Sequence, residues 1–353
     1  MNYPALKINL EKLEHNTKLL SDKCSQHGIK IAAVTKVFCC LPQVAEALVR
    51  GGASYFADSR VENLKKIKHL DVPKILLRIP MLSQVEDVLE YADISLNSEY
   101  TVIKALSDAA LKKGKVHDII LMIDLGDLRE GVWMEDAVDY AGKLLELKGI
   151  NLKGIGTNLT CYGAVIPKED NLGKLVEIAK NIEEKYKIKL DIISGGNSSS
   201  LYLIDKGSIP KGINNLRLGE SIVLGNETAY GNRIEGTFND CFVFSAEIVE
   251  LKEKQSIPIG EIGMDAFGNK PFFEDKGIRK RAILSVGKQD VRPDGLTSLD
   301  DKLIILGASS DHTIVDITDS SNNYAIGDTI DFLLDYGALL GLSTSEYINK
   351  VII

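Results

Sequence analysis

Lys36 follows an apolar run of the chain, and a lysine in that place can do chemistry. Residues 29–34 (IKIAAV) are rich in β-branched and small apolar side chains, which is typical of a fully buried strand. A lysine just beyond such a strand can simply extend its ammonium group into water. It can also be a desolvated amine whose lowered pKa suits it to form a Schiff base. Its surroundings must decide between the two interpretations.

Two further segments have the composition of an anion site. Residues 194–200 (SGGNSSS) offer glycines, backbone N–H groups and three consecutive hydroxyls ahead of a helical stretch. Residues 217–221 (RLGES) place a glycine close to an arginine. Alone, SGGNSSS is more often a polar turn with a helix N-cap. Combined with a strand-end lysine, the two segments indicate a phosphate site beside an amine, and pyridoxal phosphate is the cofactor that needs both.

The elements that must position these residues alternate in type along the chain. Apolar strand-like runs lie near residues 30–35, 54–57, 74–79, 93–97, 117–124, 152–158, 190–194 and 214–218, and helical patterns separate most of them. Eight such runs over about 200 residues predict a (β/α)8 barrel, whose chemistry lies at the carboxyl ends of the strands. A doubly wound open sheet is the alternative, but no glycine-rich dinucleotide motif follows the first runs.

The texture of the sequence changes after about residue 230. Short strand-like runs separated by turn residues follow, with few helical periods, which predicts a β-rich C-terminal domain over residues 231–353. The barrel then covers residues 11–230. Residues 1–10 contain another strand-like run (ALKINL), which we expect to join the C-terminal domain.

Composition excludes several functions. The chain of 353 residues has 44% hydrophobic and 26% charged residues and a net charge of −8, so a nucleic-acid partner is not expected. The first residues lack the pattern of a signal peptide, and no apolar run approaches the roughly 20 residues that span a bilayer. Five cysteines without C-x-x-C spacing indicate neither a disulfide framework nor a metal site. We therefore expect a cytoplasmic protein with reduced thiols and no membrane partner.

Six segments, in order, resemble one protein family. They are AAVTK (32–36), IDLGDLREG (123–131), GIGTNLT (154–160), GGNSSS (195–200), LRLGES (216–221) and LGASSDHTIVDIT (306–318). Together they resemble the fold-type III pyridoxal-phosphate enzymes, the group of alanine racemase, over nearly the full chain. Other stretches, such as SRVENLKKIKHL and NLTCYGAVIPK, resemble a subgroup, the clostridial ornithine racemases.

The resemblance implies roles for individual residues. It implies that Lys36 carries the cofactor and that Arg217 faces the pyridine nitrogen, which a permanently protonated guanidinium should keep unprotonated. The other implied residues are Arg129 near the phenolic oxygen and the substrate carboxylate, Asn158 where the family has a histidine beside the ring, Asn197, Ser198, Gly219 and Glu220 at the phosphate, and Asp311 at the substrate. Tyr336 is a further candidate for the phosphate.

The resemblance also implies an activity. We expect an amino-acid racemase acting on ornithine, with alanine, lysine and arginine as alternative substrates. A related basic amino-acid decarboxylase and a non-catalytic pyridoxal-phosphate carrier remain open, although carriers lack the second domain. The family works as a homodimer with shared active sites, so a homodimer is expected here.

One residue of the family is missing. Alignment of residues 247–268 places Ile262 where the family has the tyrosine that moves the second proton, and isoleucine cannot carry a proton. We expect Asp265, in the glycine-flanked stretch GMDAFG, to replace it as a desolvated carboxylate with a raised pKa. An ordinary turn aspartate is the alternative interpretation, and Glu261, His312 and Tyr336 are the other candidates for the base. Asp311 and the acidic segment 261–275 are candidates to hold the side-chain ammonium of ornithine.

Overall fold

The computed structural model describes residues 2–265 and 267–353, and the chain forms two compact units. The barrel unit is Leu10–Phe238. The β unit combines the residues up to Asn9 with Asn239–Ile353. The predicted limits of the barrel, residues 11 and 230, both lie inside Leu10–Phe238.

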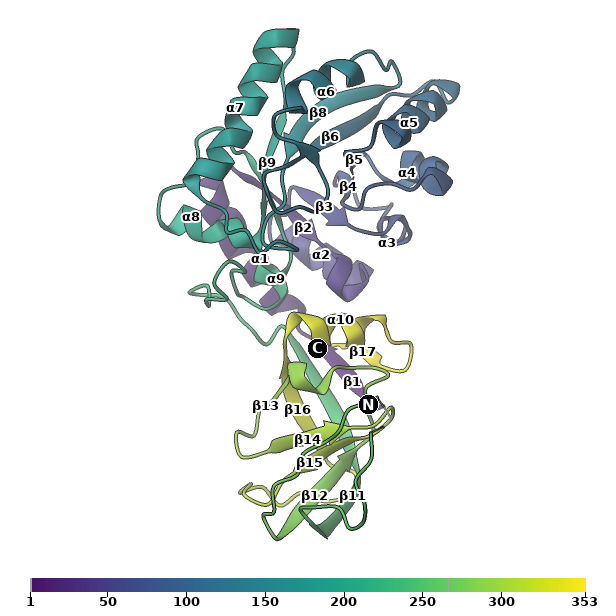
Figure 1. Ribbon diagram of the computed structural model, residues 1–353, viewed down its shortest axis with the longest axis vertical. Coiled ribbons are helices and arrows are strands. Elements are labelled where there is room, and N and C mark those ends of the chain that lie inside the picture. The colour runs from purple at the N-terminus through teal and green to yellow at the C-terminus, as the bar shows by residue number, and fades with distance from the viewer. Residues whose placement is uncertain (1, 266) are drawn as a thin grey trace. The chain divides into compact units, whose positions relative to one another are not determined.

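The strands of the barrel unit close into a ring. They are β2 (Lys30–Val34), β3 (Tyr55–Asp58), β4 (Lys74–Leu76), β5 (Ile94–Asn97), β6 (His117–Asp124), β8 (Ile150–Gly156), β9 (Ile192–Asn197) and β10 (Asn215–Leu218), with the short β7 (Val132–Trp133) beside β6. Neighbouring strands are parallel in the order β5-β4-β3-β2-β10-β9-β8-β6, and β5 also pairs with β6. The predicted (β/α)8 barrel is therefore confirmed, and the open doubly wound sheet is wrong because this last pairing closes the sheet (Figure 1).

Helices surround these strands (Figure 1). They are α1 (Leu10–Ser25), α2 (Pro42–Arg50), α3 (Val61–Lys66), α4 (Val85–Tyr91), α5 (Tyr100–Lys112), α6 (Ala137–Leu144), α7 (Glu169–Tyr186), α8 (Leu201–Asp205) and α9 (Glu220–Val223), with 3-10 turns η1 (Lys36–Phe38), η2 (Leu82–Gln84) and η3 (Ser198–Ser200). The longer helices are amphipathic; α5, for example, buries Val102, Ile103, Leu106 and Ala110. In the described residues, no helix is both long and apolar enough to cross a bilayer.

Apolar side chains fill the inside of the barrel. The cluster contains Ala32, Val34, Ala57, Ile75, Ile94, Leu96, Ile120, Met122 and Ile192, drawn from most of its strands. A barrel interior packed in this way is a core rather than a channel. The polar residues that could do chemistry therefore have to lie at the ends of the strands.

The β unit is built on an antiparallel sheet. Its strands are β1 (Ala5–Ile8), β11 (Phe242–Gln255), β12 (Ile278–Leu284), β13 (Leu296–Ser298), β14 (Ile304–Ala308), β15 (Thr313–Asp316), β16 (Thr329–Leu334) and β17 (Asn349–Ile352), with the turn η4 (Pro293–Gly295) and the helix α10 (Tyr336–Thr344). β1 pairs with β11 and with β17, so the strand at the start of the chain is part of the C-terminal sheet. The predicted β-rich second domain is confirmed.

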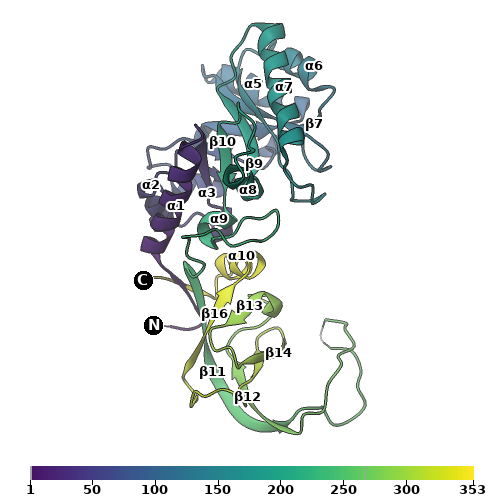
Figure 2. The same ribbon diagram turned by 90° about the vertical axis from the view of Figure 1, so that its left-hand side faces the viewer.

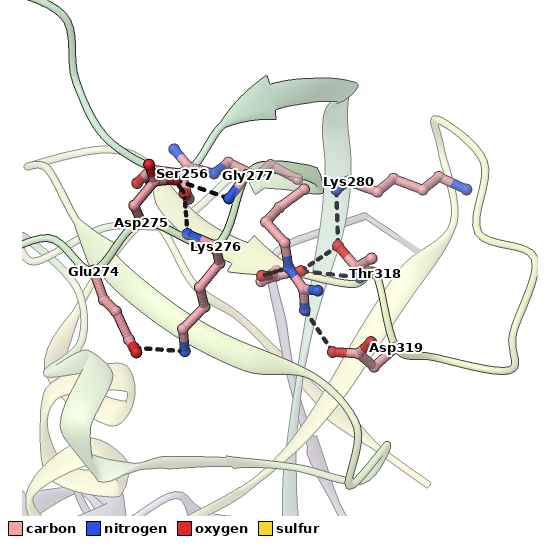
Figure 3. Close-up of polar contacts among 11 residues, drawn as sticks. Ser256, Glu274, Asp275, Lys276, Gly277, Lys280, Thr318 and Asp319 are labelled. Atoms are coloured by element: carbon pink, nitrogen blue, oxygen red, sulfur yellow. Dashed lines mark hydrogen bonds and ion pairs between the residues drawn. The ribbon is translucent and has the colours of Figure 1, made fainter.

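A long loop joins β11 to β12, which we call the β11–β12 loop (residues 256–277). Figure 2 shows it leaving the end of the sheet. Polar contacts close its base: the Ser256 hydroxyl donates to Asp275, and it accepts a hydrogen bond from the backbone N–H of Lys276 (2.7 Å) (Figure 3). Beside it, Arg279 binds Asp316 (2.8 Å) and Asp319 (2.5 Å). The ends of this loop are thus fixed by its own unit.

Candidate active site

Lys36 lies at the carboxyl end of β2, next to the strand that carries Arg217. β10 pairs with β2 in parallel register, with Arg217 opposite Ala32. Lys36 begins the turn η1 directly after Thr35, and its side chain is exposed in the chain as described. Lys36 is therefore exposed in the chain by itself, and its desolvation in a complete active site stays a prediction. Its place at the barrel end is the one that the sequence predicted.

Arg217 is a buried cation, 4% exposed. It donates hydrogen bonds to Ser194 Oγ (2.5 Å), to the Thr157 carbonyl (2.7 Å) and to Asn158 Oδ1 (3.4 Å). Burial lowers its pKa to about 10, which leaves it protonated at neutral pH, and the nearby Glu130 opposes that shift. In the described residues its hydrogen bonds all go to uncharged oxygens. A buried guanidinium in such a shell favours an electron-rich or anionic ligand.

Two asparagines stand beside this arginine. Asn197 Nδ2 donates to Asn158 Oδ1 (3.1 Å) and to the Leu159 carbonyl (3.0 Å). Because Asn158 Oδ1 accepts from both Asn197 and Arg217, the amide orientation of Asn158 is fixed. Its Nδ2 is buried and, in the part of the chain that the structure describes, has no hydrogen-bond partner. An unpaired buried donor is costly, so this atom is suited to an acceptor on a ligand.

Ser198 faces the start of α9. Its hydroxyl lies 2.9 Å from Ser221 Oγ, and the backbone N–H groups of Gly219 (3.4 Å) and Ser221 (3.3 Å) point at it. These groups together can hold an anion. Of the three hydroxyls in SGGNSSS, that of Ser200 is used within the chain, because it donates to the Gly195 carbonyl (2.7 Å). Glu220 is the first residue of α9, next to these groups.

Arg129 is exposed and pairs with the adjacent Glu130. Burial of the group acts to lower the pKa of Arg129, but the hydrogen bonds and charge of Glu130 raise it overall. Nearby, Asp127 is 1% exposed and accepts hydrogen bonds from the N–H groups of Thr160 (3.1 Å) and Tyr162 (3.1 Å). Asp127 therefore fixes the loop after β8 against the loop that carries Arg129.

The sequence reasoning missed three residues of this end of the barrel. Ser221 and Glu130 lie in the segments RLGES and IDLGDLREG, directly after Glu220 and Arg129, which were predicted as site residues. Cys161 is an exposed thiol whose Sγ lies 3.6 Å from Asn197 Nδ2. Its position three residues after Asn158 in the sequence was the available signal. In the described residues no group of three metal-binding side chains occurs.

The remaining predicted residues belong to the β unit. In the chain by itself the pKa of Asp265 is lowered, so the raised pKa stays a prediction for the site that a partner covers. The N–H groups of Asn269 (2.8 Å) and Phe267 (2.9 Å) donate to its carboxylate, and these hydrogen bonds lower its pKa. Asp311 is exposed and accepts a hydrogen bond from Ser310 (2.7 Å), and Tyr336 begins α10 and is half-buried. The other candidates, Glu261 and His312, are exposed.

The fold and this end of the barrel define a class: two-domain barrel proteins with a lysine at the end of one strand and a buried arginine on the neighbouring strand. The model of the alanine racemase N-terminal domain matches residues 8–227. An ornithine racemase of Acetoanaerobium sticklandii is 56% identical over 349 residues, which is 99% of both chains. A lysine racemase of Thermotoga maritima is 39% identical over 353 residues, again 99% of both chains. The chain belongs to the alanine racemase family, as its motifs predicted.

Solved structures agree on the fold. An alanine racemase of Clostridium difficile 630 superposes with a TM-score of 0.74 at 17% identity, covering 99% of this chain and 95% of that one. An alanine racemase of Streptomyces lavendulae gives a TM-score of 0.76 at 16% identity, covering 99% and 96%. Both the barrel and the second domain are therefore shared with this family.

Proposed function

We propose that this protein is a pyridoxal-phosphate-dependent racemase that interconverts L- and D-ornithine. The observation that carries the proposal is the pairing of β2 with β10, which brings Lys36 and the buried Arg217 to the same end of one barrel. Identity of 56% over 99% of the chain to an ornithine racemase supports ornithine as the substrate. The lysine racemase relative, at 39%, makes lysine the second candidate.

The residues present fit pyridoxal phosphate. Arg217 offers a buried cation to the ring nitrogen, and Asn158 Nδ2 offers an unpaired donor near it. Ser198 and the N–H groups of Gly219 and Ser221 are suited to the phosphate, with Asn197 and Glu220 beside them. When bound, this cofactor delocalises the negative charge that remains after an amino acid loses its α-proton.

We assign a separate role in the reaction to each of three side chains at this end of the barrel. The Lys36 amine would hold the cofactor, and as a free amine it could take or return the α-proton on one face of the substrate. Arg217 would keep a ring nitrogen bound beside it unprotonated, because a guanidinium does not give up its proton at neutral pH. That limits charge delocalisation, favours prompt return of the proton and so favours racemisation. Arg129 is positioned on an exposed loop, where it can pair with the substrate carboxylate in exchange for Glu130.

The residue that moves the proton on the second face remains a prediction. Asp265 is our candidate because a carboxylate can accept a proton, although its lowered pKa makes it a weak base in the chain by itself. To act, it has to release or share its hydrogen bonds to Phe267 and Asn269. Asp311 stays a candidate for the side-chain ammonium of ornithine, and Tyr336 for the phosphate.

We further propose a homodimer in which the β unit of one subunit contributes to the other subunit's site. The exposed apolar side chains of the β11–β12 loop support a protein partner. Ile259, Met264 and Phe272 are 95%, 79% and 91% exposed, which is costly in water. We expect the protein in the cytoplasm, where its five cysteines stay reduced.

The test uses purified protein reconstituted with pyridoxal 5'-phosphate and supplied with L-ornithine. Loss of optical rotation without release of CO2 is the expected result, with slower turnover of L-lysine and little of L-alanine. Release of CO2 would indicate a decarboxylase, and neither change would indicate a carrier. Equal turnover of ornithine and alanine would remove the argument for a cationic substrate pocket.

A further inference from the structure

The residues around Lys36 form a turn that is tied down at both ends. We call residues 35–40 the lysine turn. At its start, Thr35 Oγ1 donates a hydrogen bond to Asp58 Oδ2 (2.6 Å). Near its end, the Cys39 carbonyl accepts a hydrogen bond from Lys66 Nζ (2.7 Å). Both ties come from the neighbouring strand and helix, β3 and α3.

The two ties are connected to each other. Asp58 Oδ1 accepts hydrogen bonds from Asn63 Nδ2 (3.1 Å) and from the N–H of Arg60 (2.9 Å). Asn63 Oδ1 in turn accepts one from Lys66 Nζ (3.0 Å). A continuous chain of hydrogen bonds therefore runs from Thr35 through the side chains of Asp58, Asn63 and Lys66 to Cys39, and it brackets Lys36.

The backbone that these bonds hold is an unfavourable one. Cys39 and Cys40 have φ values of 52° and 51°, which lie in the left-handed region that residues other than glycine rarely adopt. Two such residues in succession persist only where surrounding contacts impose the conformation, and such strain gathers at functional sites. Lys66 binds the carbonyl of the first of them.

The centre of the chain is buried. Thr35 and Asp58 are both 0% exposed, and Asn63 is 7% exposed. Burial raises the pKa of Asp58, while the hydrogen bonds from Thr35, Arg60 and Asn63 act against that shift. Burying a carboxylate costs solvation free energy, and here its hydrogen bonds go to Thr35, Arg60 and Asn63 beside the lysine turn.

We propose that Asp58, Asn63 and Lys66 are positioning residues that hold the lysine turn so that the Lys36 amine is aimed at the cofactor aldehyde. The proposal rests on the proposed function, since it requires Lys36 to be the cofactor lysine. Lys36 condenses with the aldehyde with release of one water, and a turn fixed at both ends orders the amine before that reaction. Loss of either tie frees the turn and slows the condensation.

Lys66→Met tests the exposed end of the chain, and Lys65→Met is its matched control. Both lysines are exposed on α3, but Lys65 Nζ lies over the ring of Tyr91 (5.2 Å to its centre) and not on the lysine turn. The cofactor-free proteins are mixed with pyridoxal 5'-phosphate, and the rate of appearance of the lysine-bound form is followed by absorbance. Borohydride reduction and peptide mapping then give the fraction of label on Lys36.

We expect Lys66→Met to slow the condensation by about tenfold, as loss of a charge-assisted hydrogen bond implies, with an unchanged thermal midpoint. Lys65→Met should behave as the parent, and Lys66→Arg should recover most of the rate. Asp58→Asn should slow the reaction too; if that variant does not fold, the Lys66 series decides alone.

The outcomes separate two failures. If the parent protein carries no label on Lys36, the proposed function fails. If the parent is labelled on Lys36 but Lys66→Met condenses as fast as Lys65→Met, the positioning role is wrong and the proposed function stands.

Discussion

Asp58 of the barrel unit and Asp265 of the β unit accept similar hydrogen bonds, but their pKa values are shifted in opposite directions. In the described residues, each carboxylate accepts three: Asp58 from Thr35, Arg60 and Asn63, and Asp265 from Phe267 and twice from Asn269. Burial raises the pKa of Asp58, whereas the hydrogen bonds lower that of Asp265, which stays in contact with water. Access to solvent, and not the number of hydrogen bonds, sets the sign.

Access to solvent also distinguishes the lysine turn from the β11–β12 loop in the chemistry that each can perform. The lysine turn and Asp58 are parts of one packed unit, so their geometry is complete within it. The β11–β12 loop is fixed at its base, but it exposes apolar side chains such as Phe272. Its chemistry depends on the surface that covers it. A partner that buried Asp265 would raise its pKa and bring it closer to a useful base.

The largest effect should come from removing the buried carboxylate. Asp58→Ala leaves the Thr35 hydroxyl, the Arg60 N–H and the Asn63 amide without their acceptor in a dry site, which should cost about 2–4 kcal/mol of unfolding free energy. Asp265→Ala, at an exposed turn, should change it little. Urea denaturation followed by circular dichroism measures both. Equal losses in the two variants would contradict the difference in burial.

The pH dependence should separate the two carboxylates by sign. Since the folded pKa of Asp58 is raised, its stabilising effect is complete below the unfolded value of about 3.9 and is lost as the pH rises through the folded pKa. The folded pKa of Asp265 is lowered, so its contribution is present above about 3.9 and is lost as the pH falls.

Stability against pH, measured for the parent, Asp58→Asn and Asp265→Asn, checks these signs. The parent's advantage over Asp58→Asn should shrink from pH 4 upward, and its advantage over Asp265→Asn should shrink toward pH 3, with the thresholds set by an unfolded pKa of about 3.9. Slopes of the same sign in both pairs would show that the burial of one carboxylate is misassigned.

A smaller and more selective effect is expected on the reaction. Asp265→Asn should slow racemisation of both enantiomers, yet it should still allow exchange of the α-proton with solvent deuterium from the enantiomer that faces Lys36. Proton magnetic resonance in deuterium oxide measures both processes. A normal racemisation rate in both directions for Asp265→Asn would remove it as the second base.

The barrel could be predicted from the sequence because each of its strands has a local sequence pattern. A buried parallel strand is a continuous apolar run, so each predicted run became a strand, and each motif at a run's end reached the same end of the barrel. Lys36, Asn158, Ser198 and Arg217 were located in this way.

The environment of each side chain was harder to predict. Residues 58–63 (DSRVEN) form one of the strand-end segments, but the bond between Thr35 and Asp58 joins two strands and has no local pattern. Likewise, the pKa of Asp265 depends on whether another surface buries its loop. The local sequence around a glycine-flanked aspartate does not show whether such burial occurs.

The proposed function depends on Lys36 as the residue that carries the cofactor, and chemical labelling can identify that residue. Protein reconstituted with pyridoxal 5'-phosphate is reduced with borohydride, digested and analysed by mass spectrometry. We expect one pyridoxyl group per chain on the peptide that contains Lys36, and no absorbance of a lysine-bound cofactor in Lys36→Ala. Label on a different lysine, or undiminished absorbance in Lys36→Ala, would contradict it.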